Sequence, residues 1–171
     1  TDLMICNEKG EGMCIAGVFG GSKSGVSDAT TTIFLESAYF QPSCVRKTSM
    51  HHQLKTDASF RFERGTDPEG TVRALKRAAI LICEIAGGHI SSDLVDIYPQ
   101  KIEPAQFIVK HKNLDRLIGI TIPREEIFAI LERLDIHVTE KKADSFKVSV
   151  PPYRVDVKQE ADIVEEVLRI Y

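Results

Sequence analysis

The chain has no apolar run long enough to cross a membrane, and no charged and apolar leader opens it. It also contains no internal repeat and no low-complexity segment. With 43% apolar and 27% charged residues, its composition is that of a soluble globular protein and argues against disorder. These features predict a cytoplasmic protein with no membrane partner.

Cysteine is sparse, and positive charge is not in excess. Cys6, Cys14, Cys44 and Cys83 are widely spaced and show no paired-ligand pattern. Their number alone permits a disulfide or a zinc site, but scattered reduced thiols in a cytosolic core are favoured. The net charge of −3 excludes electrostatic binding of nucleic acid by the chain as a whole, so any RNA contact must be local.

The sequence pattern predicts two small α+β units in tandem, residues 1–99 and 100–171, joined by a proline-bounded linker at 99–104. Hydrophobic periodicity and the glycine and proline positions place the elements. In the first unit we expect two hairpin strands, a buried strand, two helices and a closing strand: 3–7, 13–18, 31–40, 42–52, 68–86 and 90–98. In the second we expect a strand, two helices, two hairpin strands and a final helix: 106–111, 114–118, 123–134, 137–140, 145–150 and 161–170.

The most informative segment is glycine-rich. Residues 17–28 (GVFGGSKSGVSD) hold four glycines within nine positions and lead into the apolar segment 31–40, which carries one carboxylate, Glu36. A second polar run follows at 54–68 (LKTDASFRFERGTDP). Glycine lets a backbone approach a ligand closely, and a carboxylate among apolar residues is costly to bury without a partner. Together these features predict a pocket wall that reads a polar group on an otherwise apolar ligand.

The succession of GVFGG, SGV, the FLES strand and LKTDASFRFERGTDP resembles the β subunit of bacterial phenylalanyl-tRNA synthetase. The resemblance continues to the closing run VPPYRVDVKQEADIVEEVLRIY and covers essentially all 171 residues. It implies that 1–99 is the C-terminal part of a mixed-sheet tRNA-editing domain and that 100–171 is the subunit's fifth domain, a winged-helix-like scaffold. The chain is therefore expected to be an internal piece of a longer protein.

The resemblance implies a site that hydrolyses tyrosine wrongly attached to the phenylalanine tRNA. An apolar pocket rejects an added hydroxyl only weakly, whereas a site that hydrogen-bonds the hydroxyl discriminates strongly. By the resemblance, Glu36 accepts that hydrogen bond, Gly20 leaves the pocket open, and Thr56 and Ala58 line it. From the residues alone, other readings stay open: a solvent-facing glutamate, a turn glycine, a capping threonine and a filler alanine.

The expected site is incomplete. Hydrolysis of an activated ester needs only an oriented water near hydrogen-bond donors, not a protein nucleophile. The family's pocket also uses a histidine from the earlier half of the domain, which neither His51 nor His52 matches. We therefore expect the 171-residue chain alone to be inactive on tyrosyl-tRNA.

A second group of candidates is acidic. Asp162, Glu165 and Glu166 stand at i, i+3 and i+4 on one helix face, and Asp156 precedes them. Carboxylates at the start of a helix suit Mg²⁺, but they also simply complement the helix dipole. The resemblance implies a Mg²⁺ site shared with an α subunit, which we expect to be weak or empty in this chain.

Basic residues are the candidates for RNA contact. The densest group, beside the expected pocket, provides the candidates for the 3′ end of tRNA: Arg46, Lys47 and Lys55. On the long helix, Arg73, Lys76 and Arg77 form either a solvated face or a phosphate contact. The helix at 123–134 carries charges of both signs, unlike a reader of DNA.

The function implied is that of phenylalanine–tRNA ligase, an α₂β₂ enzyme that joins phenylalanine to its tRNA with ATP. The aminoacylation chemistry would reside in the α subunit, and this chain would carry part of the editing site. A non-catalytic tRNA-binding or assembly module of the same fold is the alternative. A free-standing editing protein is disfavoured because the resemblance continues into the fifth domain.

Overall fold

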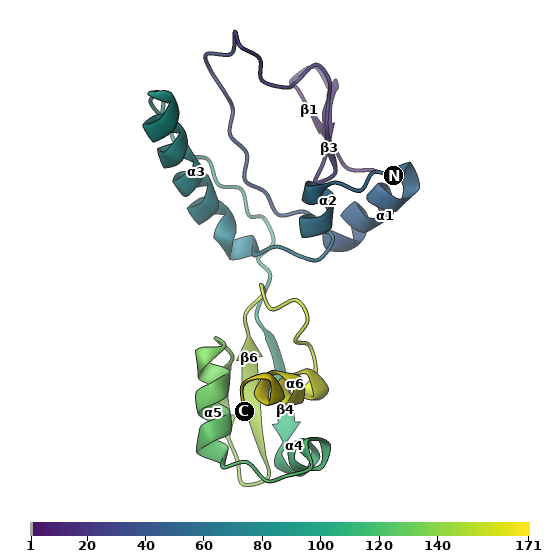
Figure 1. The fold of residues 1–171 in the computed structure, drawn as a ribbon, viewed down its shortest axis with the longest axis vertical. Helices are drawn as coiled ribbons and strands as arrows, with labels where there is room; N and C mark the ends of the chain where they lie inside the picture. The colour runs from purple at the N-terminus through teal and green to yellow at the C-terminus, as the bar shows by residue number, and fades with distance from the viewer. Residues whose placement is uncertain (1) are drawn as a thin grey trace. The chain divides into compact units, whose positions relative to one another are not determined.

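The computed structural model describes residues 2–171, which divide into two compact units, one ending at Pro99 and the other spanning Gln100–Tyr171 (Figure 1). Each combines helices with an antiparallel three-stranded sheet, so the predicted α+β class is confirmed. Within the described residues, no helix is both long enough and apolar enough to span a membrane.

The first unit begins with a sheet in the order β1–β2–β3, made of Met4–Cys6, Gly12–Ile15 and Phe19–Gly20. The predicted hairpin is confirmed, and its turn is held by the Asn7 side chain, whose Oδ1 accepts from the backbone N–H groups of Lys9 and Glu11 at 3.0 Å each. The third strand lies inside the glycine-rich segment, where the sequence predicts only a loop. Gly20 therefore belongs to the sheet, and Gly21 follows directly after the strand.

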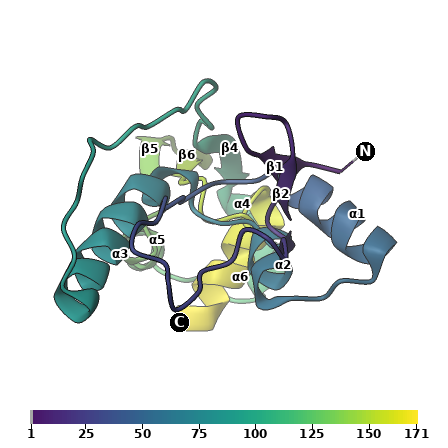
Figure 2. The same ribbon diagram turned by 90° about the horizontal axis from the view of Figure 1, so that it is seen from above.

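The helices of the first unit are α1, α2, the 3-10 turn η1 and α3, spanning Pro42–His52, Asp57–Phe62, Pro68–Gly70 and Thr71–Ala86. Pro42 and Pro68 open their elements as predicted, and Gly87, with φ 70°, ends α3 in the left-handed conformation. The sequence did not predict α2, because six residues are too few to show helical periodicity. Figure 2 shows α1 and α2 beside the hairpin, with α3 apart from them.

Two strand predictions are wrong. Residues 31–40 and 90–98 form no ladder with any described strand, and side chains in both are exposed: Phe34 by 94% and Val95 by 78%. β-branched content favours an extended backbone, but a strand also needs a neighbour whose N–H and C=O groups pair with its own. Residues 31–40 therefore form no strand, and none of them is buried, unlike the predicted buried strand.

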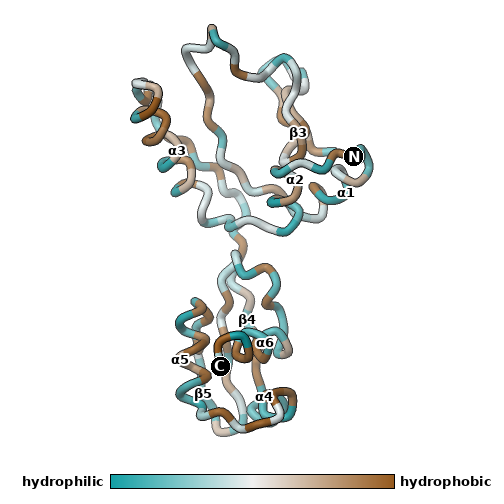
Figure 3. Tube along the Cα trace, in the orientation of Figure 1, coloured by the Kyte–Doolittle hydropathy of each residue, from teal (hydrophilic) through white to brown (hydrophobic). Residues whose placement is uncertain are grey.

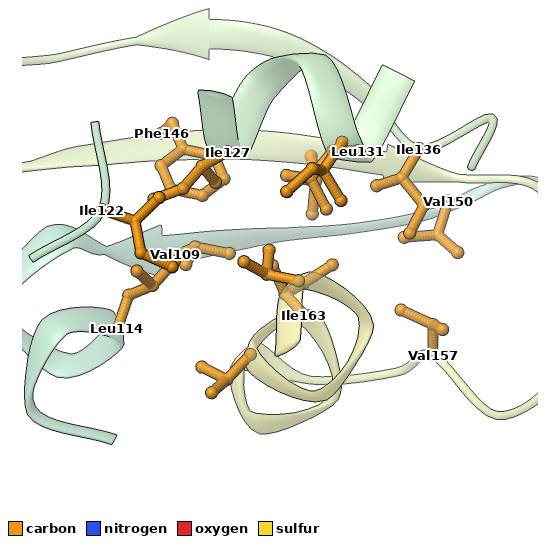
Figure 4. Packing of buried hydrophobic residues seen from close by; sticks show 14 residues of the cluster. Val109, Leu114, Ile122, Ile127, Leu131, Ile136, Phe146, Val150, Val157 and Ile163 are labelled. Carbon is orange, nitrogen blue, oxygen red and sulfur yellow. The ribbon is translucent and has the colours of Figure 1, made fainter. Parts of the chain in front are cut away.

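In the second unit every predicted element is present: β4, α4, α5, β5, β6 and α6, spanning Ala105–Lys110, His111–Ile118, Arg124–Arg133, His137–Lys141, Ser145–Val150 and Glu160–Ile170. The sheet order is β4–β6–β5, with Phe107 opposite Val148. One sheet face packs with the three helices in a single apolar core (Figure 4). Apolar residues follow the inner face of α5 and α6 in Figure 3, which is the periodicity that predicted them.

An ion pair joins α4 to the start of α5. The Arg124 guanidinium donates to both carboxylate oxygens of Asp115, one of them at 2.7 Å, and both side chains are 29% exposed. These hydrogen bonds hold the pKa of Asp115 below its ordinary value of 3.8. Because folding lowers the pKa of Asp115, the pair stabilises the fold fully above the pKa that Asp115 has in the unfolded chain. This stabilisation is lost as the pH falls through the lower pKa of the folded state.

We predict that Asp115→Asn lowers the free energy of unfolding by about 1 kcal/mol at pH 7, since a bidentate pair is replaced by a neutral contact. The difference from the original chain should stay constant between pH 5 and pH 8 and shrink below about pH 4. Urea denaturation followed by circular dichroism measures it, with the exposed Glu125→Gln as the control. A pH-independent difference would contradict the assignment.

Candidate functional site

The first unit contains a cavity of about 660 Å³. Its walls come from the hairpin, from residues 36–40, from α2 and from the start of α3. Figure 1 shows the segment after β3 passing between α3 and the hairpin. Three of the predicted pocket residues line the cavity: Gly20, Glu36 and Ala58.

Glu36 lines the cavity, but the residue is itself exposed, as is much of the unpaired segment that carries it. Burial of the Cys14 thiol on β2 is the main cause of its raised pKa, and the charge of Glu36 raises that pKa further, so the carboxylate lies near that strand. No described residue donates a hydrogen bond to the Glu36 carboxylate. The cavity therefore presents a free anionic acceptor among mainly apolar neighbours such as Ile5, Ile15 and Phe40.

Two glycines shape the wall in different ways. At Gly20, which lines the cavity, an added Cβ would meet nothing within 4 Å and would project into open space. At Gly17, with φ 69°, a Cβ would lie 3.0 Å from Phe40, 3.2 Å from Val45 and 3.3 Å from Phe62. Gly17 thus permits the packing of the Phe40 and Phe62 rings, whose centroids are 5.0 Å apart.

Thr56 does not line the cavity but fixes a residue that does. Its hydroxyl donates to the carbonyl of Val18 at 2.6 Å and accepts the backbone N–H of Ser59 at 3.0 Å. Ser59 returns a contact to the Thr56 backbone N–H, which completes a capping box at the start of α2. The capping role left open by the sequence and a supporting role for the pocket are therefore both present.

Other lining residues escaped the sequence reasoning. Thr66, Asp67 and Arg73 line the same cavity, from the turn before α3 and its first turn. The Thr66 hydroxyl oxygen is buried without a hydrogen-bond partner. Arg73 is exposed, and it forms no ion pair with a described residue. Only the alternative of a phosphate contact by Arg73 pointed in this direction, and no sequence signal placed Thr66 at the pocket.

The basic residues predicted to bind the 3′ end of tRNA lie elsewhere. Arg46 and Lys47 are exposed on α1, and Lys55 is exposed just after it. None of the three lines the cavity. On the same helix His52 pairs with Asp2 at 2.8 Å, and this hydrogen bond lowers the pKa of Asp2. The role of these cations stays a prediction.

The predicted metal ligands are engaged with protein groups. Asp162 accepts the backbone N–H groups of Lys158 at 2.8 Å and Gln159 at 3.0 Å, which is the helix-start role. Glu166, only 4% exposed, contacts Arg154 at 2.9 Å and Arg169 at 3.0 Å.

Arg169 gathers the remaining acids. It also contacts Glu165 at 2.6 Å, and its pKa is raised by Glu165 first and also by Glu166 and Asp156. Within residues 2–171, no three acidic, histidine or cysteine side chains form a group that could hold a metal ion. As arranged, Glu165 and Glu166 bind a guanidinium and Asp162 binds backbone N–H groups, so these carboxylates do not fit Mg²⁺, which needs their oxygens free.

Comparison with known proteins places both units. Residues 1–87 match the family described as B3/4 domain, and residues 107–171 match the tRNA synthetase B5 domain. The chain is 49% identical over 170 residues to the phenylalanine–tRNA ligase β subunit of Bacteroides thetaiotaomicron, and 52% identical over 173 residues to that of Bacteroides fragilis strain YCH46. Each match covers 99% of this chain and 21% of the relative. The chain thus spans about a fifth of the length of these relatives.

A solved structure is also similar in sequence. It is an N-terminal fragment of the phenylalanyl-tRNA synthetase β subunit from Pyrococcus horikoshii, 29% identical, covering 42% of this chain and 20% of that one. Its TM-score of 0.38 is too low to bear on the fold.

We predict that Gly17→Ala destabilises the first unit by about 2 kcal/mol, for two reasons. Alanine is strained at the left-handed backbone conformation of this position, and its Cβ would crowd the Phe40 ring. Gly25→Ala, where a Cβ meets nothing within 4 Å, should change stability by less than about 0.5 kcal/mol. Urea denaturation of both variants compares them directly. Equal stability of the two would show that the cavity wall tolerates a side chain at Gly17.

We predict that Glu166→Ala costs about 3 kcal/mol in the second unit, because it leaves the Arg154 guanidinium, 21% exposed, without its anion. Glu165→Ala, at an exposed pair on the same helix, should cost less than about 0.5 kcal/mol. Thermal denaturation distinguishes them. A similar, small effect of both changes would mean that Glu166 is free to act as a ligand.

Proposed function

The chain belongs to the B3/4 domain family, and because a tRNA synthetase B5 domain follows in it, we propose that it is a segment of a phenylalanine–tRNA ligase β subunit whose first unit holds part of a site that hydrolyses tyrosyl-tRNA. The observation that supports this most is the free Glu36 carboxylate in an apolar-lined cavity. In the proposed parent enzyme, α and β subunits assemble as α₂β₂ in the cytoplasm and attach phenylalanine to its tRNA with ATP.

Discrimination follows from what Glu36 would accept. The phenolic O–H of tyrosine donates to the carboxylate, whereas a phenylalanine ring would leave that carboxylate desolvated and unpaired. A charged acceptor makes the hydrogen bond stronger than a neutral one would. The ring itself packs among the apolar residues of the wall, and the open space at Gly20 leaves room for it.

The chain's own residues would position the ester and would not attack it. Among the described residues Cys14 is the only thiol in the wall, and its raised pKa keeps it protonated and therefore a poor nucleophile. Water is then the attacking group, and it adds to the ester carbonyl while the ribose oxygen leaves with a proton. The remaining groups of the site would come from outside this chain, so inactivity of the chain alone stays a prediction.

Metal binding is a separate matter. Mg²⁺ at Asp156, Asp162, Glu165 and Glu166 would require Arg169 to release two of these acids. ATP and the aminoacylation step are assigned to the α subunit, and no step here depends on either.

A non-catalytic tRNA-binding or assembly module remains the competing function. It would need the same fold and the same exposed cations, but no use for a carboxylate in the cavity. The two functions therefore differ at Glu36 alone.

We predict that Glu36→Ala in the full-length heterotetramer lowers kcat/KM for tyrosyl-tRNA hydrolysis by roughly 10- to 100-fold, the value of a charged hydrogen bond. Phenylalanine attachment should be unchanged. Release of labelled tyrosine from preformed tyrosyl-tRNA measures the first rate. Glu84→Ala, an exposed acid on α3 that does not line the cavity, is the matched control. Unchanged tyrosine release would favour the binding module.

A further inference from the structure

The cavity is larger than a tyrosyl group needs. Its volume of about 660 Å³ lies within the range of roughly 300–1,000 Å³ typical of sites for whole ligands. Glu36 stands on one wall, and the segment around the start of α3 forms another. That second wall has polar groups for which the reading of a phenol gives no role.

Arg73 is the only cation of the cavity wall among the described residues. It lies in the first turn of α3, where the helix dipole favours an anion, and no described residue pairs with it. Lys76 and Arg77, on the same helix, do not line the cavity. The position of Arg73, and not merely its charge, therefore distinguishes it.

Thr66 adds an independent sign of a missing partner. Its hydroxyl oxygen is buried and unpaired, and it lines the same cavity. A buried hydroxyl without a partner is costly, and such groups commonly mark a place that a ligand or a water completes. Asp67 beside it is already engaged, since its Oδ1 accepts the backbone N–H of Glu69 at 3.0 Å.

We propose that Arg73 binds a phosphodiester of the terminal nucleotides of the aminoacylated RNA, at the wall of the cavity that also carries Thr66. This rests on the proposed function. In an aminoacyl ester the carboxylate is consumed and the α-amino group is cationic, so phosphate is the only anion that the substrate offers. Arginine suits it because its planar donors match two phosphate oxygens.

The test uses full-length heterotetramer and tyrosyl-tRNA, with Arg73→Met compared with Arg77→Met. Methionine keeps much of the apolar stem and removes the charge, so each variant loses one positive charge from the same helix. Arg73→Met should raise KM about 10-fold with kcat little changed, as expected for loss of a charged hydrogen bond in binding. Arg77→Met should match the original enzyme, and Arg73→Lys should restore most of the loss.

Salt dependence provides a second readout. Each phosphate contact contributes about −0.7 to the slope of log affinity against log salt for a single strand, so Arg73→Met should flatten the slope by about that amount. Aminoacylation and the melting temperature check that the variants fold.

The two proposals fail in different ways. If the original enzyme leaves tyrosyl-tRNA intact, the proposed function is wrong. If the original enzyme hydrolyses it and Glu36→Ala does not, but Arg73→Met has the KM and salt slope of Arg77→Met, only the role of Arg73 is overturned. A fall in kcat at unchanged KM overturns it as well, since a phosphate contact acts in binding.

Discussion

The cavity depends on one hydrogen bond between distant parts of the chain, from the Thr56 hydroxyl to the carbonyl of Val18. It ties the end of the hairpin to the start of α2, so the glycine-rich wall and the wall that carries Ala58 keep a fixed relation. Gly17 completes the junction, because only a residue without a side chain leaves Phe40 and Phe62 their places. The hydrogen bond from Thr56 to Val18 and the left-handed conformation of Gly17 thus shape the cavity, and no large apolar core among the described residues contributes to it.

The two units are stabilised differently. Nearly all of the fully buried apolar side chains belong to one cluster in the second unit, whereas the first unit buries Ala16, Val18 and Val45. In the second unit, sheet and helices hide their apolar faces against each other. In the first, α3 has no fully buried residue among those described, and residues 31–40 find no ladder partner. Because the cavity walls in the first unit are partly exposed and lack some hydrogen-bond and charge partners within it, their polar groups are available to bind a ligand.

This difference explains how far the sequence could predict the structure. Periodicity located every element of the second unit because its helices and strands are each long enough to show a repeat and share one core. The strand predictions at 31–40 and 90–98 were wrong, because β-branched content reports only a local backbone preference. Strand formation also requires a neighbouring strand, which these segments lack among the described residues. The pocket residues Gly20, Glu36 and Ala58 were found through the family resemblance. Thr66 and Arg73 were not found as lining residues, because only the fold brings them to the cavity.

The acidic helix shows the same limit for charge. The spacing of Asp162, Glu165 and Glu166 places them on one helix, α6, but spacing among acids says nothing about the groups that bind each of them. Arg154 arrives from the preceding loop and Arg169 from one turn further on, and both bind Glu166. In the cavity the situation is reversed, since Glu36 and Arg73 find no partner among residues 2–171. If they were paired with each other, these charges would stabilise the fold. Unpaired, Glu36 stays available for the proposed hydrogen bond with the tyrosine hydroxyl, and Arg73 for the proposed contact with a phosphate.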